Sequence, residues 1–380
     1  MRVARQYRSH ARTLQPALSG RTTPPLGLVA YLVLLLMAAP SAHAAVSLLL
    51  EQPYGKLNLF LPSGHSAIYL DHVCAETPLK LRPCRPGELG VVISRYDDIS
   101  NHDWVAMPLI PYLYSVSSAA EIPQSVDRAS ESQLRDTYRR QYLQSVAPDR
   151  PDGSAPGGNW YELVGSAFDR TIYGFRLNTT AEQDAKFIAT FNDRRNVEDY
   201  NGALHNCADF ARVTINQFYP HAVRRNYIAD LGMTSPKSVA RSLSHYASKH
   251  PGVGFEVFVI PQVNGDLPRS HSNKDLAEYI LKRYSVPLVV VSPISTAVVF
   301  AAYVGQGRFS MPKHPPLLLD LDELSSSDPS ESINRPFPPM LPSLPPPVRT
   351  LMTASEGGVT MPAAKSAAAR VSLVHAGMVP

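Results

Sequence analysis

The sequence predicts an α+β fold, because strand patterns and helix patterns alternate along the chain. Several runs are rich in branched and aromatic residues and are bounded by turn formers, as is typical of strands. Between them, apolar residues recur at intervals of three and four, as is typical of amphipathic helices. The expected strands are residues 67–70, 89–96, 171–177 and 255–260, and the expected helices are 131–144, 181–193 and the segments that begin at 207 and 236. We expect them to build one domain over residues 45–284, a length suited to a single hydrophobic core.

The expected helices begin at recognisable capping signals. Ser130 with Gln133 and Thr180 with Gln183 are capping boxes, in which two side chains satisfy free N–H groups of the first turn. Ser235-Pro236 is another helix start, because proline is favoured in the first helical turn. Each start is followed by an apolar stripe, formed by Leu134, Tyr138 and Tyr142, by Phe187, Ile188 and Phe191, and by Val239, Leu243 and Tyr246.

The strand expected at 67–70 carries a histidine at its entrance. It follows Pro62-Ser63-Gly64 and ends before Asp71. Side chains alternate along a strand, so His65 and His72 lie on opposite faces and cannot both approach one partner from here. We choose His65 as the functional candidate because it follows a glycine, where another element can approach closely.

Cys207 is the candidate nucleophile. It opens a helix whose apolar stripe consists of Ala211, Ile215 and Phe218. Asn206 is placed to cap that helix with its side-chain oxygen. A thiol attacks a carbonyl only as the thiolate, which a helix N-terminus and a nearby imidazolium both favour. His205, next to the cysteine, stays open as an alternative base.

The first residues resemble an export signal. Basic residues up to Arg21 precede an apolar run from Leu26 to Ala39, and Ala42-His43-Ala44 then supplies a small-x-small cleavage site. We expect residues 1–44 to be a signal peptide that is cleaved after Ala44, with a retained membrane anchor as the alternative. The mature protein would then be periplasmic or lie on the outer face of the membrane.

All three cysteines lie beyond that site. In an exported protein Cys74 and Cys84 are natural disulfide partners across a short loop with no obvious regular structure. Cys207 is then a free thiol, and outside the cytoplasm such a thiol is expected to be buried or used. A disulfide between Cys207 and one of the other two cysteines is the alternative.

Two short motifs resemble a known family. Gly64 to Leu70 reads Gly-His-Ser-Ala-Ile-Tyr-Leu, and Asn206 to Phe210 reads Asn-Cys-Ala-Asp-Phe. A histidine strand followed by a cysteine helix resembles the circularly permuted branch of the NlpC-type papain-like fold, whereas ordinary papain-like enzymes have the opposite order. Lecithin:retinol acyltransferase-like proteins and permuted cysteine peptidases share this order. The resemblance covers about the central half of the mature chain.

The resemblance implies a papain-like core, in which the helix with the nucleophile packs on an antiparallel sheet with the base. It assigns Cys207 as nucleophile, His65 as base and nearby backbone N–H groups as the oxyanion site. In this family a third polar residue orients the histidine from a neighbouring strand. On the strand expected at 89–96 the candidates are Ser94 and Tyr96, and neither matches the family's usual residue.

The composition changes beyond Tyr284. Residues 285–305 form an apolar segment without a charged side chain, and its core at 286–304 suits either a membrane helix or, given its prolines and valines, a buried strand and turn. Membrane association through 286–304 is therefore one expectation. Residues 306–380 are rich in proline and are expected to be a disordered tail or spacer.

Several partners and cofactors are not expected. The net charge of +4 is spread over both signs and forms no basic stripe, so we expect no nucleic-acid partner. The chain contains no His-Glu-x-x-His or Cys-x-x-Cys pattern and no Gly-rich phosphate loop, so we expect no metal and no cofactor.

Three classes of function remain. The first is an exported thiol hydrolase, an amidase or peptidase on cell-envelope peptides, with a Cys207–His65 dyad. The second is a cysteine acyltransferase or lipid hydrolase at the membrane, with the same dyad and an acyl substrate. The third is a papain-like domain that binds its partner without chemistry. Substrate identity depends on loops and pocket shape, which the sequence does not specify.

Overall fold

The computed structural model describes residues 44–55, 63–227, 230, 232–305, 309, 311 and 315–318. Strands and helices alternate along these residues, so the α+β class is confirmed. Apart from Ala44, the expected signal peptide lies outside the described residues, as does most of the proline-rich tail. The signal peptide stays a prediction, as does the tail beyond residue 318. Within 315–318 the expectation of disorder was wrong, because Leu317 forms a parallel bridge with Val259.

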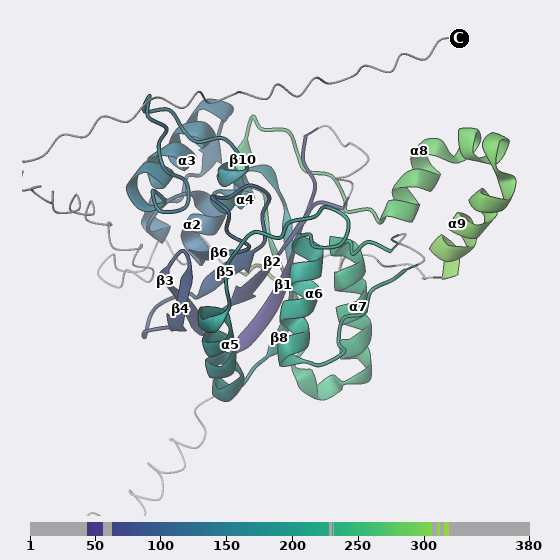
Figure 1. Ribbon diagram of the computed structural model, residues 1–380, viewed down its shortest axis with the longest axis horizontal. Coiled ribbons are helices and arrows are strands. Elements are labelled where there is room, and N and C mark those ends of the chain that lie inside the picture. The colour runs from purple at the N-terminus through teal and green to yellow at the C-terminus, as the bar shows by residue number, and fades with distance from the viewer. Residues whose placement is uncertain are drawn as a thin grey trace, which may run out of the picture. The chain divides into compact units, whose positions relative to one another are not determined.

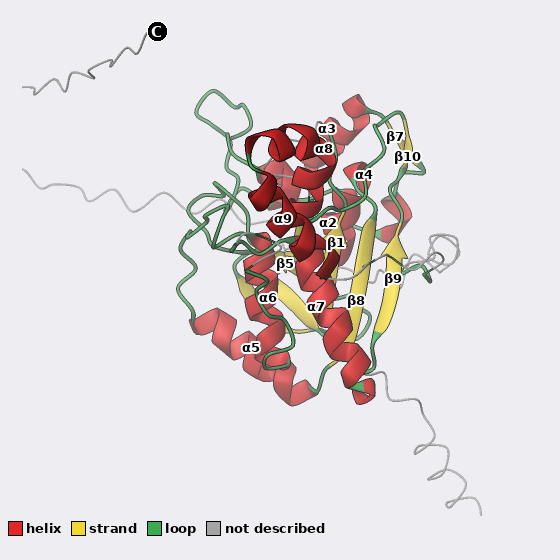
Figure 2. Cartoon of the chain, turned by 90° about the vertical axis from the view of Figure 1, so that its right-hand side faces the viewer, coloured by secondary structure: helices red, strands yellow, loops and turns green. Residues whose placement is uncertain are grey.

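A six-stranded sheet with the order β6-β5-β2-β1-β8-β9 forms the centre of the fold, and each neighbouring pair is antiparallel (Figures 1 and 2). Its strands are β1 (Ala45–Glu51), β2 (His65–Leu70), β5 (Val91–Ser94), β6 (Val105–Pro108), β8 (Ile172–Asn178) and β9 (Glu256–Ile260). Two smaller sheets pair β3 (Val73–Thr77) with β4 (Lys80–Pro83), and β7 (Ser125–Val126) with β10 (Asn264–Gly265).

Helices cover both faces of the central sheet (Figures 1 and 2). One core cluster joins the sheet to α5 (Ala181–Asp193), α6 (Cys207–Phe218) and α7 (Pro236–Lys249). The other joins it to α2 (Leu109–Tyr114), α3 (Arg128–Tyr142) and α4 (Ser166–Asp169). Short 3-10 turns lie at Ala119–Glu121, Trp160–Leu163 and Pro251–Val253. The alternation expected along β2 is confirmed, because Ala67 and Tyr69 belong to one cluster while Ile68 and Leu70 belong to the other.

The capping signals located the helix starts well. Thr180 caps α5 with Gln183 completing the box, Ser235 caps α7, and Asn206 caps α6, all as predicted. The expected start of α3 was wrong by three residues. Asp127 is its N-cap, and its carboxylate accepts the Ser130 N–H at 2.8 Å, so Ser130 stands inside the first turn. A carboxylate is as good a cap as a hydroxyl, and the charge also suits the positive end of the helix.

Strands form at all four expected places, but the structure also has strands that were not expected. β2, β8 and β9 match their predictions, while β5 is shorter than the predicted 89–96. The central strand β1 was missed. Its residues are buried along the whole length, so it lacks the alternation that marks a half-exposed strand, and it follows directly on the apolar leader.

The disulfide between Cys74 and Cys84 is confirmed, and Cys207 is a free, buried cysteine. The chain between the paired cysteines is not irregular as expected. It forms the antiparallel hairpin of β3 and β4, with a bulge between Ala75 and Thr77. The disulfide therefore joins two strands that already pair.

Residues 276–305 are helical, so the alternative of a buried strand at 286–304 was wrong. They form α8 (Leu276–Val291), which is kinked at Tyr284, and α9 (Pro293–Gly305). Only the first turn of α8 is buried, from Leu276 to Tyr279. Among the residues described here, no helix has both the length and the apolar character needed to cross a membrane.

A glycine of β8 makes room for a side chain of the edge strand β9. Gly174 pairs with Phe258 of β9, and a Cβ added at Gly174 would overlap the Phe258 ring. We expect Gly174→Ala to lower the free energy of unfolding by about 1–3 kcal/mol, the usual range for overpacking. Urea denaturation measures it. Gly252→Ala is the control, because its new Cβ meets nothing within 4 Å; equal losses in both variants would contradict the packing argument.

Candidate active site

The structure brings His65 and Cys207 together in one cleft of about 480 Å³. His65 is the first residue of β2, and Cys207 is the first residue of α6. Tyrosines and charged side chains form much of the remaining wall, among them Tyr54, Tyr96, Asp97, Glu162 and Arg170. The two residues singled out from the sequence are thus neighbours, although more than a hundred residues separate them along the chain.

Asn206 fixes the start of the helix that carries the thiol. Its Oδ1 accepts the Asp209 N–H at 2.9 Å, while its Nδ2 donates to the carbonyl of Thr234 at 3.0 Å and to that of Gly202 at 3.1 Å. One side chain therefore caps α6 and ties it to the loops on either side. The sulfur lies at the positive end of α6, where a thiolate is favoured.

Ser94 is the polar partner of the histidine. Its Oγ lies 2.8 Å from His65 Nε2 and donates to the Ser66 carbonyl at 2.9 Å. Because the single hydroxyl proton goes to that carbonyl, the oxygen is left to accept the Nε2 proton. Nδ1 is then the ring nitrogen that can take a proton from the thiol. Tyr96 stacks on the same ring, with centroids 5.1 Å apart and an interplanar angle of 17°.

The two ionisable groups shift each other toward the charged pair. Burial alone would lower the pKa of His65, but the Cys207 charge and hydrogen bond, with Glu51 and Glu162 adding, raise it to about 9. Burial would raise the pKa of Cys207, but the His65 charge and hydrogen bond outweigh it, and the N–H and hydroxyl of Ser66 contribute. The pKa of Cys207 is therefore lowered, which favours a thiolate–imidazolium pair.

A buried carboxylate lies next to the pair. Glu51 ends β1, directly opposite His65 in the β1–β2 register. Its carboxylate accepts the Tyr112 hydroxyl and the Ser166 hydroxyl, the latter at 2.6 Å, and lies 3.6 Å from Arg170 Nε. All these groups are buried.

Arg170 joins this carboxylate to the wall of the cleft. Its Nη2 lies 3.2 Å from a Glu162 oxygen, and its guanidinium lies 4.6 Å from the centre of the Tyr54 ring. Burial opposes the charge of Arg170, but Glu162 and Glu51 raise its pKa. Arg170 therefore stays cationic and compensates the two acids that act on His65.

Arg95 connects the histidine side of the site to the cysteine helix. It follows Ser94 at the end of β5, and its Nε pairs with Asp103 at 2.5 Å. Its guanidinium lies 5.6 Å from the centre of the Phe210 ring, in the first turn of α6. The phenylalanine of the Asn-Cys-x-x-Phe motif thus has a structural reason, because it packs α6 against the end of β5.

Gly64 is approached closely by other parts of the chain, as expected of a glycine at this place. Its φ is +76°, and an added Cβ would clash with the carbonyl oxygen of Glu51 and lie 2.9 Å from Asn273 Nδ2. That nitrogen donates to the carbonyls of Glu51 at 2.8 Å and Ser63 at 2.7 Å. The close approach at this glycine therefore involves β1 and Asn273, and α6 is not the element concerned.

The other histidines near the motifs have different partners. His205 Nδ1 lies 2.7 Å from Asp199 on the exposed surface, and His205 does not line the cleft. His72 Nδ1 lies 2.7 Å from Asp71 and is also exposed. The geometry therefore favours His65 over both as the partner of the thiol.

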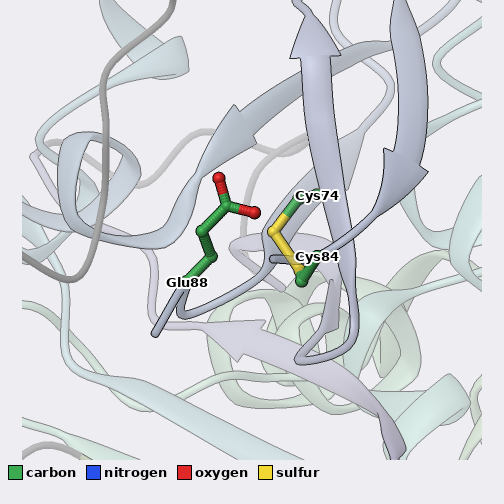
Figure 3. A group of neighbouring side chains, drawn as sticks. All are labelled: Cys74, Cys84 and Glu88. Carbon is green, nitrogen blue, oxygen red and sulfur yellow. A yellow bond between two sulfur atoms is a disulfide. The ribbon is translucent and has the colours of Figure 1, made fainter. Parts of the chain in front are cut away.

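One group of possible metal ligands is already engaged in a disulfide and a salt bridge. Cys74, Cys84 and Glu88 place their ligand atoms within 4.8 Å of one another (Figure 3). The two sulfurs are joined in the disulfide, so neither is available as a thiolate. Both Glu88 oxygens accept hydrogen bonds from Arg82, at 2.6 and 2.7 Å.

Comparison with protein-family models, with curated proteins and with solved structures gave no match to this chain. The assignment of the cleft therefore depends on its own geometry. Sequence reasoning singled out His65 and Cys207, which lie in one cleft, and placed Ser94 on the neighbouring strand β5. Tyr96 lies beyond the end of that strand, and Glu51, Arg170 and Asn273 were missed. Glu51 left one signal in the sequence, since it is an acid directly after Leu48-Leu49-Leu50.

The charged pair predicts a pH dependence for thiol reactivity. The thiolate is present above the lowered pKa of Cys207, and the imidazolium persists up to the His65 pKa of about 9. His65→Ala removes the imidazolium charge and its hydrogen bond while burial remains, so we expect the thiol pKa to rise. Alkylation by iodoacetamide at pH 7 should slow by about tenfold or more, since one pKa unit changes the thiolate fraction tenfold. Equal rates in both proteins from pH 6 to 9 would contradict the pairing.

The hydrogen bond between Ser94 and His65 should also affect the reactivity of the thiol. Ser94→Ala removes the acceptor for Nε2, and a hydrogen bond to a charged group contributes about 1.5–3 kcal/mol. We expect alkylation at pH 7 to slow by about tenfold, with the circular dichroism spectrum unchanged. Ser244→Ala is the matched control, because its hydroxyl donates to the Ala240 carbonyl within α7, at 2.8 Å. A Ser94 variant as reactive as this control would remove Ser94 from the site.

Proposed function

We infer that this protein is an exported thiol hydrolase of the circularly permuted papain-like type, an amidase or peptidase that acts on cell-envelope peptides. The observation that carries the proposal is the free Cys207 at the N-terminus of α6, paired with His65 in a cleft. The order of histidine strand and cysteine helix, with the helix packed on an antiparallel sheet, supports the permuted papain-like assignment.

The reaction would follow from the roles of the two residues. His65 holds the thiol proton, and the Cys207 thiolate attacks the amide carbonyl carbon to form a C–S bond. The leaving amine takes the proton from His65 as the C–N bond breaks. A water molecule, deprotonated by His65, then attacks the thioester, releases the carboxylic acid and returns the thiol.

The start of α6 offers donors for the oxyanion. Asn206 accepts two N–H groups of the first turn. The Asp209 N–H donates to its side-chain oxygen, and the Phe210 N–H donates to its backbone carbonyl. Among the described residues no hydrogen bond engages the N–H groups of Cys207 and Ala208. Such groups at a helix N-terminus can stabilise the negative oxygen that forms when a carbonyl is attacked.

The wall of the cleft favours a peptide over an acyl chain. Asp97 is exposed at the cleft, and Asn159, Tyr161 and Tyr200 add groups that can form hydrogen bonds. Asn159 and Tyr161 already bond to each other, with the Tyr161 hydroxyl donating to Asn159 Oδ1 at 3.2 Å. An acyl chain would offer no hydrogen-bond partner to the Asp97 carboxylate or the Tyr200 hydroxyl, which is costly once water is excluded. A peptide carries amides and charged ends that can satisfy them.

The two alternatives differ in what supports them. Acyl transfer or lipid hydrolysis with the same dyad is favoured by the apolar surface of α8 and α9, which would suit a substrate held at a membrane. A binding domain without chemistry would be favoured by a disulfide-bonded Cys207. Since Cys74 and Cys84 pair with each other and Cys207 is free, that support is missing.

Export is supported by the same cysteine pairing. Disulfides persist in oxidising compartments and are rare in the cytoplasm. The disulfide lies in the region that would follow cleavage after Ala44, and β1 begins at Ala45.

The test is cleavage of purified muropeptides, followed by mass spectrometry. We expect wild-type protein to release fragments with a new carboxyl and a new amino end, and Cys207→Ala to release none. His65→Ala should reduce kcat by at least about a hundredfold, the low end for a general base. Ser244→Ala should match wild type.

The outcomes separate the candidate functions. Cleavage that survives Cys207→Ala would exclude the thiol mechanism. Release of fatty acid from acyl esters, with intact muropeptides, would favour the acyl alternative. An alkylation rate and pH profile like those of free cysteine would favour the binding domain.

A further inference from the structure

Residues 284–305, here called the apolar hairpin, expose an unusual amount of hydrocarbon. They comprise the part of α8 after its kink and all of α9, and the two helices lie side by side (Figures 1 and 2). Val290, Val291 and Ile294 are 79%, 82% and 78% exposed. The other large exposed side chains of the hairpin are Tyr284, Val286, Val289, Val298, Phe300 and Val304. An exposed apolar surface of this extent marks an interaction site.

The exposed residues surround the helix and do not form a single stripe. Val289, Val290 and Val291 are consecutive, and successive residues of a helix point about 100° apart. All three are exposed. A helix that docks in a protein groove keeps a polar face toward water, whereas a helix that is apolar all round belongs in a core or in lipid.

The polar side chains at the turn of the hairpin bond within that turn. The hydroxyls of Ser292 and Ser295 lie 2.8 Å apart, and the Thr296 hydroxyl donates to the Ser292 carbonyl at 2.9 Å. Residues 284–305 contain no Asp, Glu, Lys, Arg or His. Moving the turn out of water would therefore leave few groups without a hydrogen-bond partner.

The base of the hairpin carries positive charge. Lys282 and Arg283 are exposed just before it, and Arg308 and Lys313 follow it in the sequence. The nearby acid, Glu278, is already paired with Lys237 at 2.7 Å and Lys282 at 2.6 Å. Cations beside an apolar helix favour an anionic lipid surface.

We propose that the apolar hairpin inserts into a lipid membrane from one side, with its basic base among anionic headgroups. α9 has 13 residues, so it is about 20 Å long at about 1.5 Å per residue. That is shorter than the roughly 30 Å hydrocarbon core of a bilayer, so the hairpin can enter from one side without crossing it. The proposal is independent of the thiol chemistry, because no residue of the hairpin lines the cleft.

The test measures vesicle binding by the chain from Ala44, which keeps all described residues and lacks the apolar run 26–39. Vesicles of phosphatidylcholine alone are compared with vesicles that also contain phosphatidylglycerol, by co-sedimentation. We expect binding to both, stronger to the anionic vesicles and weaker at high salt. The double variant Val290→Asp, Val291→Asp should bind about tenfold or more weakly, because charge is costly in lipid. The protein expressed from the full-length chain is measured in parallel after its leader has been cleaved. The ratio of vesicle binding between wild type and the double variant should be the same as for the chain from Ala44.

Control experiments test whether something other than lipid covers the apolar hairpin. Val197→Asp changes a valine that is 53% exposed outside the hairpin and should bind like wild type. Sedimentation velocity without vesicles tests a second copy, and removal of residues 319–380 tests the tail. Absent vesicle binding, or equal binding by the double variant, would overturn the proposal. So would a change from dimer to monomer in the double variant with vesicle binding intact. Thiol alkylation should be unchanged in every variant, so failure here leaves the cleft untouched.

Discussion

The burial of Glu51 is the constraint on which the site depends. An unpaired charge in the interior is very costly, so a carboxylate at the end of the central strand needs partners from other elements. α2 supplies Tyr112, α4 supplies Ser166, and the entrance of β8 supplies Arg170. Each must lie within hydrogen-bond or ion-pair distance. Since Glu51 lies opposite His65 in the register, the same set of contacts fixes the end of β2 that carries His65.

The electrostatics of the cleft follow from that arrangement. Burial opposes the charge on both members of the dyad, and the mutual attraction of thiolate and imidazolium outweighs it in each case. The acids near His65 act in the same direction as the thiolate. Arg170 lies beside both acids, with its Nε 3.6 Å from a Glu51 oxygen and its Nη2 3.2 Å from a Glu162 oxygen. A helix N-terminus on the sulfur side and a hydroxyl on the ring side then set where the proton lies.

Local signals made part of this predictable. A cap and its helix are close in sequence, so Asn206, Thr180 and Ser235 identified their helices. Ser94 illustrates the limit. Its strand was expected, but whether its hydroxyl reaches His65 depends on the register between β2 and β5, which no local pattern encodes. Asn273 was beyond reach for the same reason, because its two acceptors lie about two hundred residues earlier.

The forces that fix the cleft end at the start of α8. Asp275 pairs with Arg241 at 2.6 Å and Glu278 with Lys237 at 2.7 Å, so two ion pairs to α7 hold this first turn. Within α8 the last buried residue is Tyr279, and the backbone leaves helical geometry at Tyr284. Beyond the kink little core packing is lost when a side chain changes. Residues there are under no constraint from the folded core to be valine, isoleucine or phenylalanine, so their apolar character reflects the surroundings in which the apolar hairpin works.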